Sequence, residues 1–156
     1  MRASGGASGA ATEPERYTLD TSAVIAYMAD EPGSAQVERI LASAQAGRAE
    51  VYVSFMTYME ILYGLWRRVS ERAGKAAYLR LKALAVQRID VSEDLLLVAA
   101  RIKATHDLSV ADAWIAATAS LTRSRLVHKD PEFRPLAGEL GVVELPLTPP
   151  RPRTRA

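Results

Sequence analysis

Residues 17–28 read YTLDTSAVIAYM, and this stretch contains in brief the pattern that decides the fold. A short strand-like run, 17–19, leads directly into Asp20, and an apolar segment of helical length follows. Aspartate is a favourable residue at the start of a helix, because its carboxylate accepts a hydrogen bond from a backbone N–H in the first turn. The stretch therefore predicts a strand, a turn at Asp20, and a helix from Thr21 to Met28.

The same alternation of short strands and longer helices continues to about residue 145. Gly74 is expected to break the chain between the third and fourth helices. Strands that alternate with helices predict an α/β fold with a mostly parallel sheet that is covered on both faces. Further strands are expected at 51–53, 88–91, 125–128 and 142–145, and further helices at 34–46, 55–69, 75–85, 92–105, from 109 onward and at 131–136.

The composition restricts the class of protein. A chain of 156 residues, 49% of them hydrophobic, is long enough for one domain with a single core. It has no cysteine, which excludes a disulfide framework and a zinc site built on thiolates. Neither a signal peptide nor an apolar run of about 18 residues is visible, so we expect a cytoplasmic protein without a membrane span.

The two ends of the chain differ in composition from the body. Residues 1–15 are rich in Gly, Ala and Ser, and residues 147–156 are rich in Pro and Arg. Neither composition can bury enough apolar surface to offset the entropy of ordering, so both segments are predicted to be disordered. The folded domain is expected to span residues 16–146.

Basic residues cluster in one part of a body that is otherwise close to neutral. Within residues 67–88 only Glu71 opposes them. Such a cluster is either a solvated helical face or a surface that contacts phosphates. Its members are Arg67, Arg68, Arg72, Lys75, Arg80, Lys82 and Arg88, of which the first four are the candidates for phosphate contact.

Four acidic residues, Asp20, Glu60, Asp112 and Asp130, each lie where a strand-like run gives way to a helical one. A parallel sheet would bring the ends of its strands to one edge, and the four carboxylates could then form a single site for a divalent cation. Asp112 favours this interpretation, because its helix is apolar on nearly every side. A carboxylate in such a helix stays ionised only beside a cation or hydrogen-bond donors.

Each of these acids also has a purely structural interpretation. Asp20 and Asp130 could be helix caps, the latter with Pro131 at the first helical position. Glu60 stands three residues after Thr57, and Asp112 three residues after Ser109, which is the spacing of a capping box. Ser92, Glu93 and Asp94 show the same helix-start chemistry without apolar surroundings, and we assign them only to capping and to the helix dipole.

Four motifs closely resemble those of the PIN-domain ribonucleases and, within that family, of the VapC-type toxins of toxin–antitoxin pairs. They are LDTS at 19–22, YMEILYG at 58–64, LSVADAWIAATA at 108–119 and LVHKDPEF at 126–133. The resemblance extends from residue 17 to residue 145 with the motifs in the family's order. It implies a three-layer α/β/α PIN-like fold with a central, mostly parallel sheet.

The resemblance also implies site residues and an activity. Asp20, Glu60 and Asp112 would be the metal-binding triad, Asp130 a fourth acid, and Ser22 a supporting residue near the metal. The activity would be Mg²⁺- or Mn²⁺-dependent endoribonuclease cleavage of phosphodiester bonds, with 5′-phosphate and 3′-hydroxyl products. His128 departs from the family, which often has Thr there, and we interpret it as a strand-end residue and not as a general base.

Partners follow from the same resemblance. VapC-type toxins act on RNA, form homodimers, and are silenced by a cognate antitoxin protein. The helices expected within 31–46 and 51–68 are the candidates for the dimer and antitoxin contacts. Tyr58, Tyr63 and Trp66 add aromatic surface there, although each of them could equally be a core residue.

Other readings of the acidic residues are possible. A phosphoacceptor receiver domain would use Asp90 and Lys129, but such domains pair two acids after the first strand, and here Thr21 follows Asp20. A haloacid-dehalogenase-like phosphatase needs a second Asp where Ser22 stands. A third alternative keeps the PIN fold without activity, as a protein that binds RNA or an antitoxin.

Overall fold

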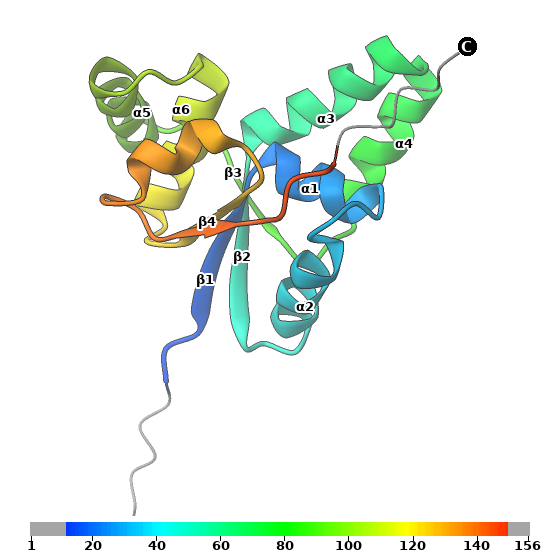
Figure 1. Cartoon of the computed structure of the whole chain (residues 1–156), viewed down its shortest axis with the longest axis horizontal. Coiled ribbons are helices and arrows are strands. Elements are labelled where there is room, and N and C mark those ends of the chain that lie inside the picture. Colours follow the sequence, from blue (N-terminus) through cyan, green and yellow to red (C-terminus); the bar gives the residue numbers. More distant parts are fainter. Residues whose placement is uncertain (1–11, 150–156) are drawn as a thin grey trace, which may run out of the picture.

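The computed structural model describes residues 12–149 and shows a central sheet with helices on both faces (Figure 1). The strands are β1 (Glu15–Leu19), β2 (Ala49–Ser54), β3 (Gln87–Ile89), β4 (Arg125–His128) and β5 (Val142–Glu144). The helices are α1 (Thr21–Met28), α2 (Ser34–Gln45), α3 (Phe55–Arg68), α4 (Glu71–Lys82), α5 (Glu93–Thr105) and α6 (Val110–Leu121), with a 3₁₀ helix η1 (Pro131–Leu136). The predicted α/β class and the predicted order of elements are therefore confirmed.

The sheet has the order β3-β2-β1-β4-β5, and all of its neighbouring strands run parallel. The chain builds the sheet outward from β1 in one direction as far as β3, and then returns to add β4 on the other side of β1. Ligands in open α/β sheets bind at such a reversal, beyond the carboxyl ends of the two strands. In this protein those ends are Asp20 after β1 and Asp130 after β4.

Alternate residues of each strand face two separate cores. Tyr17, Leu19, Val51 and Val53 pack with α1, α2, α3 and α4 on one face of the sheet. Leu126 packs with α5, α6 and η1 on the other face. Figure 1 shows the same arrangement, with α5 and α6 on one side of the strands and α1 to α4 on the other. This is the predicted three-layer architecture.

The predicted break at Gly74 was wrong. The chain turns four residues earlier, where Ser70 accepts a hydrogen bond from Ala73 N and caps α4. Gly74 lies buried inside α4, where a Cβ would come within 2.5 Å of the carbonyl oxygen of Leu62. The glycine therefore allows α3 and α4 to pack closely. Such a contact between two helices cannot be read from local sequence patterns.

Two smaller predictions also need correction. Thr57 does not cap the helix that carries Glu60, because α3 starts two residues earlier with Ser54 as its cap. The predicted third strand, 88–91, ends at Ile89, because its neighbour β2 ends at Ser54 and offers no further backbone partner. By contrast, the expected caps at Asp20, Ser92, Ser109 and Asp130 are confirmed.

The segments predicted to be disordered lie largely outside the described residues. The first described strand already includes Glu15, and residues 147–149 follow β5 without regular structure. Thr148 lies against the body of the domain, where its hydroxyl is 2.7 Å from Lys129 Nζ. Among the helices that the structure describes, none combines the length and the apolar character needed to cross a membrane.

The close contact at Gly74 leads to a stability prediction. We expect Gly74→Ala to lower the free energy of unfolding by about 1–3 kcal/mol, because overpacking against the α3 backbone outweighs the better helix propensity of Ala. Gly138→Ala is the control, since a Cβ there has no described atom within 4 Å. Urea unfolding of both variants measures the effect; equal stabilities would contradict the packing role of Gly74.

Candidate metal centre

Asp20 is the most buried acid of the predicted site, with 3% of its surface exposed. Its Oδ2 accepts hydrogen bonds from both the backbone N–H and the hydroxyl of Ser22, which caps α1 and fixes the carboxylate. The Ser22 hydroxyl in turn accepts a hydrogen bond from Lys129 N at 2.9 Å. The predicted supporting residue Ser22 thus connects Asp20 to the end of β4 and acts as a positioning residue.

Glu60 is held by the hydroxyl of Thr21, which also lies beside that of Thr57. Thr21 Oγ1 donates to Glu60 Oε1 at 2.7 Å and lies 3.1 Å from Thr57 Oγ1. Thr21 directly follows Asp20, so the same turn that positions the first acid also positions the second. The sequence analysis did not assign this role to Thr21, because α1 and α3 meet only in the folded protein.

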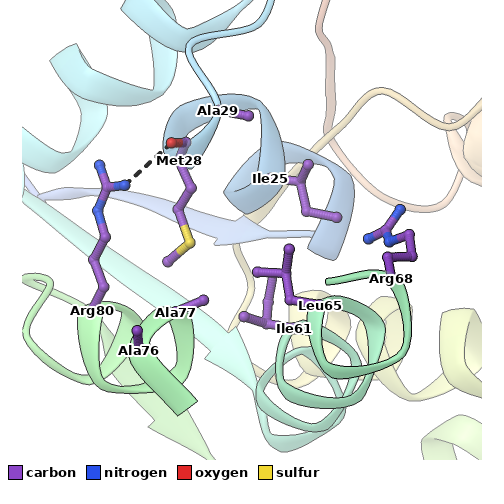
Figure 2. Close-up of a pocket in the computed structure, with 9 residues that line it drawn as sticks. All are labelled: Ile25, Met28, Ala29, Ile61, Leu65, Arg68, Ala76, Ala77 and Arg80. Atoms are coloured by element: carbon purple, nitrogen blue, oxygen red, sulfur yellow. Dashed lines mark hydrogen bonds between the residues drawn. The ribbon is translucent and has the colours of Figure 1, made fainter. Parts of the chain in front are cut away.

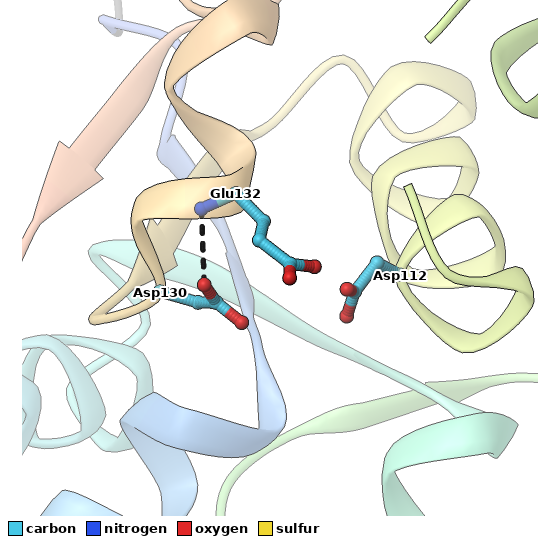
Figure 3. Close-up of side chains that lie close together, drawn as sticks. All are labelled: Asp112, Asp130 and Glu132. Carbon is cyan, nitrogen blue, oxygen red and sulfur yellow. Dashed lines mark hydrogen bonds between the residues drawn. The ribbon is translucent and has the colours of Figure 1, made fainter. Parts of the chain in front are cut away.

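Asp112, Asp130 and Glu132 form the tightest acidic cluster in the described part of the chain. One carboxylate oxygen from each lies within 4.8 Å of those from the other two. Figure 3 shows Asp112 reaching from α6 toward the carboxylate of Glu132, while Asp130 lies beside it at the start of η1. Glu132 was missed as a site residue. In the sequence its signal was its place in the LVHKDPEF motif, two residues after Asp130. In the structure its backbone N–H donates to Asp130 Oδ1 at 3.0 Å.

Asp20 and Glu60 do not belong to that tight cluster, but their charges act on the same centre. Burial raises the pKa of Asp20 to about 6, and the charge of Glu60 contributes to the rise. Burial also raises the pKa of Asp112 to about 7, with contributions from Asp20, Glu132 and Asp130. The hydroxyls of Ser22 and Ser109 counteract these shifts only in part. The four predicted acids are therefore electrostatic neighbours at one edge of the sheet.

The donors at this centre fit a small, hard cation. All of them are carboxylate oxygens, and no cysteine exists in the chain to favour a softer metal. Asp112, Asp130 and Glu132 are spaced to share one ion, and Asp20 adds a buried negative charge beside them. A divalent cation would offset the burial of charge and the smaller mutual repulsion that together raise the pKa values of Asp20 and Asp112.

His128 does not contribute to this centre. Its ring is fully buried between β4 and η1, with its centroid 5.3 Å from that of Phe133. Neither ring nitrogen has a hydrogen-bond partner among the described residues, and burial lowers the pKa of the imidazole. It ends β4, as predicted, and serves as a core residue beneath η1.

The first four residues of the predicted basic cluster line two different depressions. Arg67 and Arg68 line a depression of about 460 Å³ that also contains Glu60 and Thr21. Arg72 and Lys75 lie elsewhere, on the outer side of α4, and Lys75 pairs with Glu71 at 2.6 Å. Only Arg67 and Arg68 therefore flank the candidate metal centre.

An apolar groove of about 330 Å³ runs between α1, α3 and α4 (Figure 2). Ile25 and Met28 face Leu65 and Ala77 across it, and Arg80 donates a hydrogen bond to the carbonyl oxygen of Met28. Ile25 and Arg68 line both this groove and the depression beside Glu60. The apolar groove is thus continuous with the edge of the acidic centre.

The fold and the site together define a parallel α/β domain with a cluster of carboxylates, able to hold a metal ion, where the strand order reverses. Residues 17–139 match the PIN domain, so the chain belongs to the PIN-domain family. The search among curated proteins found no significant match.

Solved structures share the fold. VapBC2 of Rickettsia felis, bound to a promoter DNA fragment, matches with a TM-score of 0.68 at 15% identity, over 84% of this chain and 99% of the other. DNA-bound VapBC of Salmonella typhimurium matches with a TM-score of 0.67 at 18% identity, over 83% of this chain and 98% of the other. VapC20 of Mycobacterium tuberculosis, a toxin that cleaves the sarcin–ricin loop, matches with a TM-score of 0.62 at 24% identity, over 85% of this chain and 99% of the other.

The site geometry also argues against a receiver domain. Asp90 follows the edge strand β3, is exposed, and pairs with Arg88 at 2.7 Å. Lys129 Nζ forms an ion pair at 3.0 Å with Glu31, which lies in the loop between α1 and α2. The two residues that a receiver would need therefore do not meet.

The raised pKa values predict a pH-dependent stability. An unfolded aspartate titrates near about 3.9, so between about pH 4 and 7 the folded protein binds more protons at Asp20 and Asp112 than the unfolded chain does. The contribution of these groups to the free energy of unfolding therefore falls as pH rises. We expect metal-free Asp112→Asn to gain stability over the parent protein between about pH 5 and 8.

The measurement is urea unfolding of both proteins in the same buffers. The lowered pKa of His128 makes stability rise with pH, but it does so in both proteins and cancels in the comparison. Asp94→Asn, at an exposed helix start, is the matched control. Added Mg²⁺ should stabilise the parent protein more at pH 8 than at pH 5. A stability difference between Asp112→Asn and the parent that does not change with pH would contradict the assignment.

Proposed function

We propose that this protein is a metal-dependent endoribonuclease that acts as the toxin of a toxin–antitoxin pair. The observation that supports the proposal is the cluster of Asp112, Asp130 and Glu132 at the carboxyl edge of the sheet, with the charges of Asp20 and Glu60 acting on the same region. Membership of the PIN-domain family supports nuclease activity in general. The similarity in fold to VapC20, a toxin that cleaves an RNA loop, supports RNA as the substrate.

The proposed ligands of Mg²⁺ or Mn²⁺ are Asp20, Asp112, Asp130 and Glu132, with Glu60 completing the negative charge. A divalent metal bound there lowers the pKa of water and offsets charge on the phosphate during hydrolysis. Ser22 holds the Asp20 carboxylate, and Thr21 holds that of Glu60. Because burial and mutual repulsion favour protonation of Asp20 and Asp112, these residues hold a cation more tightly as pH rises.

The alternative of a silent PIN fold predicts RNA or antitoxin binding without turnover. Four predicted acids and one additional acid at the centre favour an active enzyme. None of these acids forms an ion pair with a basic residue in the described part of the chain. Lys129 and Arg134 pair with Glu31 and Glu144, and Arg68 donates a hydrogen bond to the carbonyl oxygen of Gly64. A cytoplasmic location is part of this proposal, because an antitoxin partner and RNA substrate are found there.

We expect purified protein to cleave RNA with Mg²⁺ or Mn²⁺ and to lose this activity with EDTA. Asp112→Asn and Glu132→Gln should each reduce the cleavage rate at least about 100-fold, because losing a group that merely orients a metal ligand already costs about 10- to 100-fold. Asp94→Asn should cleave at the parent rate. RNA cleavage that persists in EDTA, or in both site variants, would overturn the mechanism.

The antitoxin is proposed to bind in the apolar groove between α1, α3 and α4. The groove offers Ile25, Met28 and Leu65 to the apolar side of a partner helix. Because the groove leads to the depression beside Glu60, a partner that extends beyond it would reach the acidic centre. The neighbouring folds in toxin–antitoxin complexes support this type of partner. A homodimer is also proposed, through surface that the antitoxin leaves free.

We expect Leu65→Glu to prevent copurification with the co-expressed candidate antitoxin, because it places a charge in the apolar groove. The control is Leu96→Glu, an exposed leucine of α5 on the opposite side of the sheet. RNA cleavage by Leu65→Glu should then no longer be inhibited by the antitoxin. Retention of the antitoxin by Leu65→Glu but not by Leu96→Glu would move the interface to the α5 side.

A further inference from the structure

The depression beside Glu60 combines three kinds of side chain along one face of α3. Glu60, Tyr63 and Arg67 are spaced as i, i+3 and i+7, so they follow one another on the same side of the helix. With a rise of about 1.5 Å per residue, Tyr63 lies about 4.5 Å and Arg67 about 10 Å farther along the axis than Glu60. The face thus presents an acid, an aromatic ring and a guanidinium in that order.

Tyr63 is not a core residue. It is 42% exposed, whereas Tyr58 on the same helix is 5% exposed and packs edge-on against Tyr78 with ring centroids 6.0 Å apart. Gly64 follows it in the depression, and a Cβ at that position would meet only the flexible Arg68 side chain, at 3.4 Å. The surface next to the Tyr63 ring is therefore kept open by a residue without a side chain.

We propose that this depression is a subsite for one unpaired nucleotide of the RNA, with its base stacked on Tyr63 and the following phosphate on Arg67. The inference rests on the proposed nuclease function, because it takes the scissile phosphate to lie at the acidic centre. An exposed aromatic ring stacks an unpaired base, and a guanidinium contacts a phosphate without reading sequence. A base within a duplex cannot reach the ring, so the subsite selects single-stranded RNA or loops.

The charge of the depression favours nucleic acid over an apolar partner. Its two basic residues, Arg67 and Arg68, outnumber its one acid, Glu60, which accepts a hydrogen bond from Thr21 at the end nearest the metal centre. The adjoining apolar groove differs, because it is lined mainly by aliphatic side chains and contains neither Tyr63 nor Arg67. The two surfaces therefore suit two different ligands that meet at Ile25 and Arg68.

The test compares two RNA probes of equal charge. One is a fluorescein-labelled oligouridylate of about ten nucleotides, and the other is the same backbone without bases. We expect the parent protein, with Ca²⁺ in place of Mg²⁺, to bind the first roughly 10-fold more tightly, because stacking contributes about 1–3 kcal/mol per base. Tyr63→Leu should lose this preference while still binding the baseless probe, and Tyr63→Phe should retain it.

Trp66→Leu is the matched control, because Trp66 is a 46% exposed aromatic residue of α3 outside the depression. Arg67→Gln should weaken binding to both probes equally and reduce the salt dependence by about one phosphate contact, unlike Arg72→Gln on α4. A base preference that survives in Tyr63→Leu, or that Trp66→Leu removes equally, would overturn the subsite. These binding measurements do not depend on turnover. Absence of cleavage by the parent protein would refute the nuclease function, whereas the base preference of the Tyr63 variants decides the subsite.

Discussion

The burial of mutually repelling carboxylates at the carboxyl edge of the sheet is the constraint on which the site depends. Asp20 is almost completely buried at that edge, and Glu60, Asp112 and Asp130 surround it from three other elements. Such a cluster destabilises a fold unless a cation or protons offset its charge. The rest of the structure tolerates it because the packed faces of the sheet hold β1, β4 and α6 together independently of these acids.

At this edge of the sheet, the carboxylates that cap helices are also the candidate metal ligands. Asp20 caps α1 through Oδ2, and Asp130 caps η1 through Oδ1. In each residue the cap uses only one of the two carboxylate oxygens. Ser109 caps α6 and thereby fixes the turn from which Asp112 extends. The structural and the functional interpretations of these acids are therefore not alternatives. A helix start at the end of a parallel strand positions a carboxylate and orients it at the same time.

The surface around α3 joins three proposed activities. Its first turns carry Glu60 toward the metal centre, its exposed side offers Tyr63 and Arg67, and its remaining side forms the apolar groove with α1 and α4. A partner in the groove and a substrate in the depression would share Ile25 and Arg68. Inhibition by an antitoxin would then follow from overlap at these shared residues, without any change in the shape of the acidic centre.

The sequence by itself determined the order of strands and helices and most helix caps, and it singled out four candidate acids, because periodicity and capping depend on residues only a few positions apart. The motif resemblance added the family. Only the tertiary structure placed Glu132 beside Asp112, gave Thr21 its role at Glu60, buried Gly74 inside α4, and divided the basic cluster between two surfaces. Those features depend on strand order and on the rotation of packed helices, which arise from contacts between residues far apart in the chain.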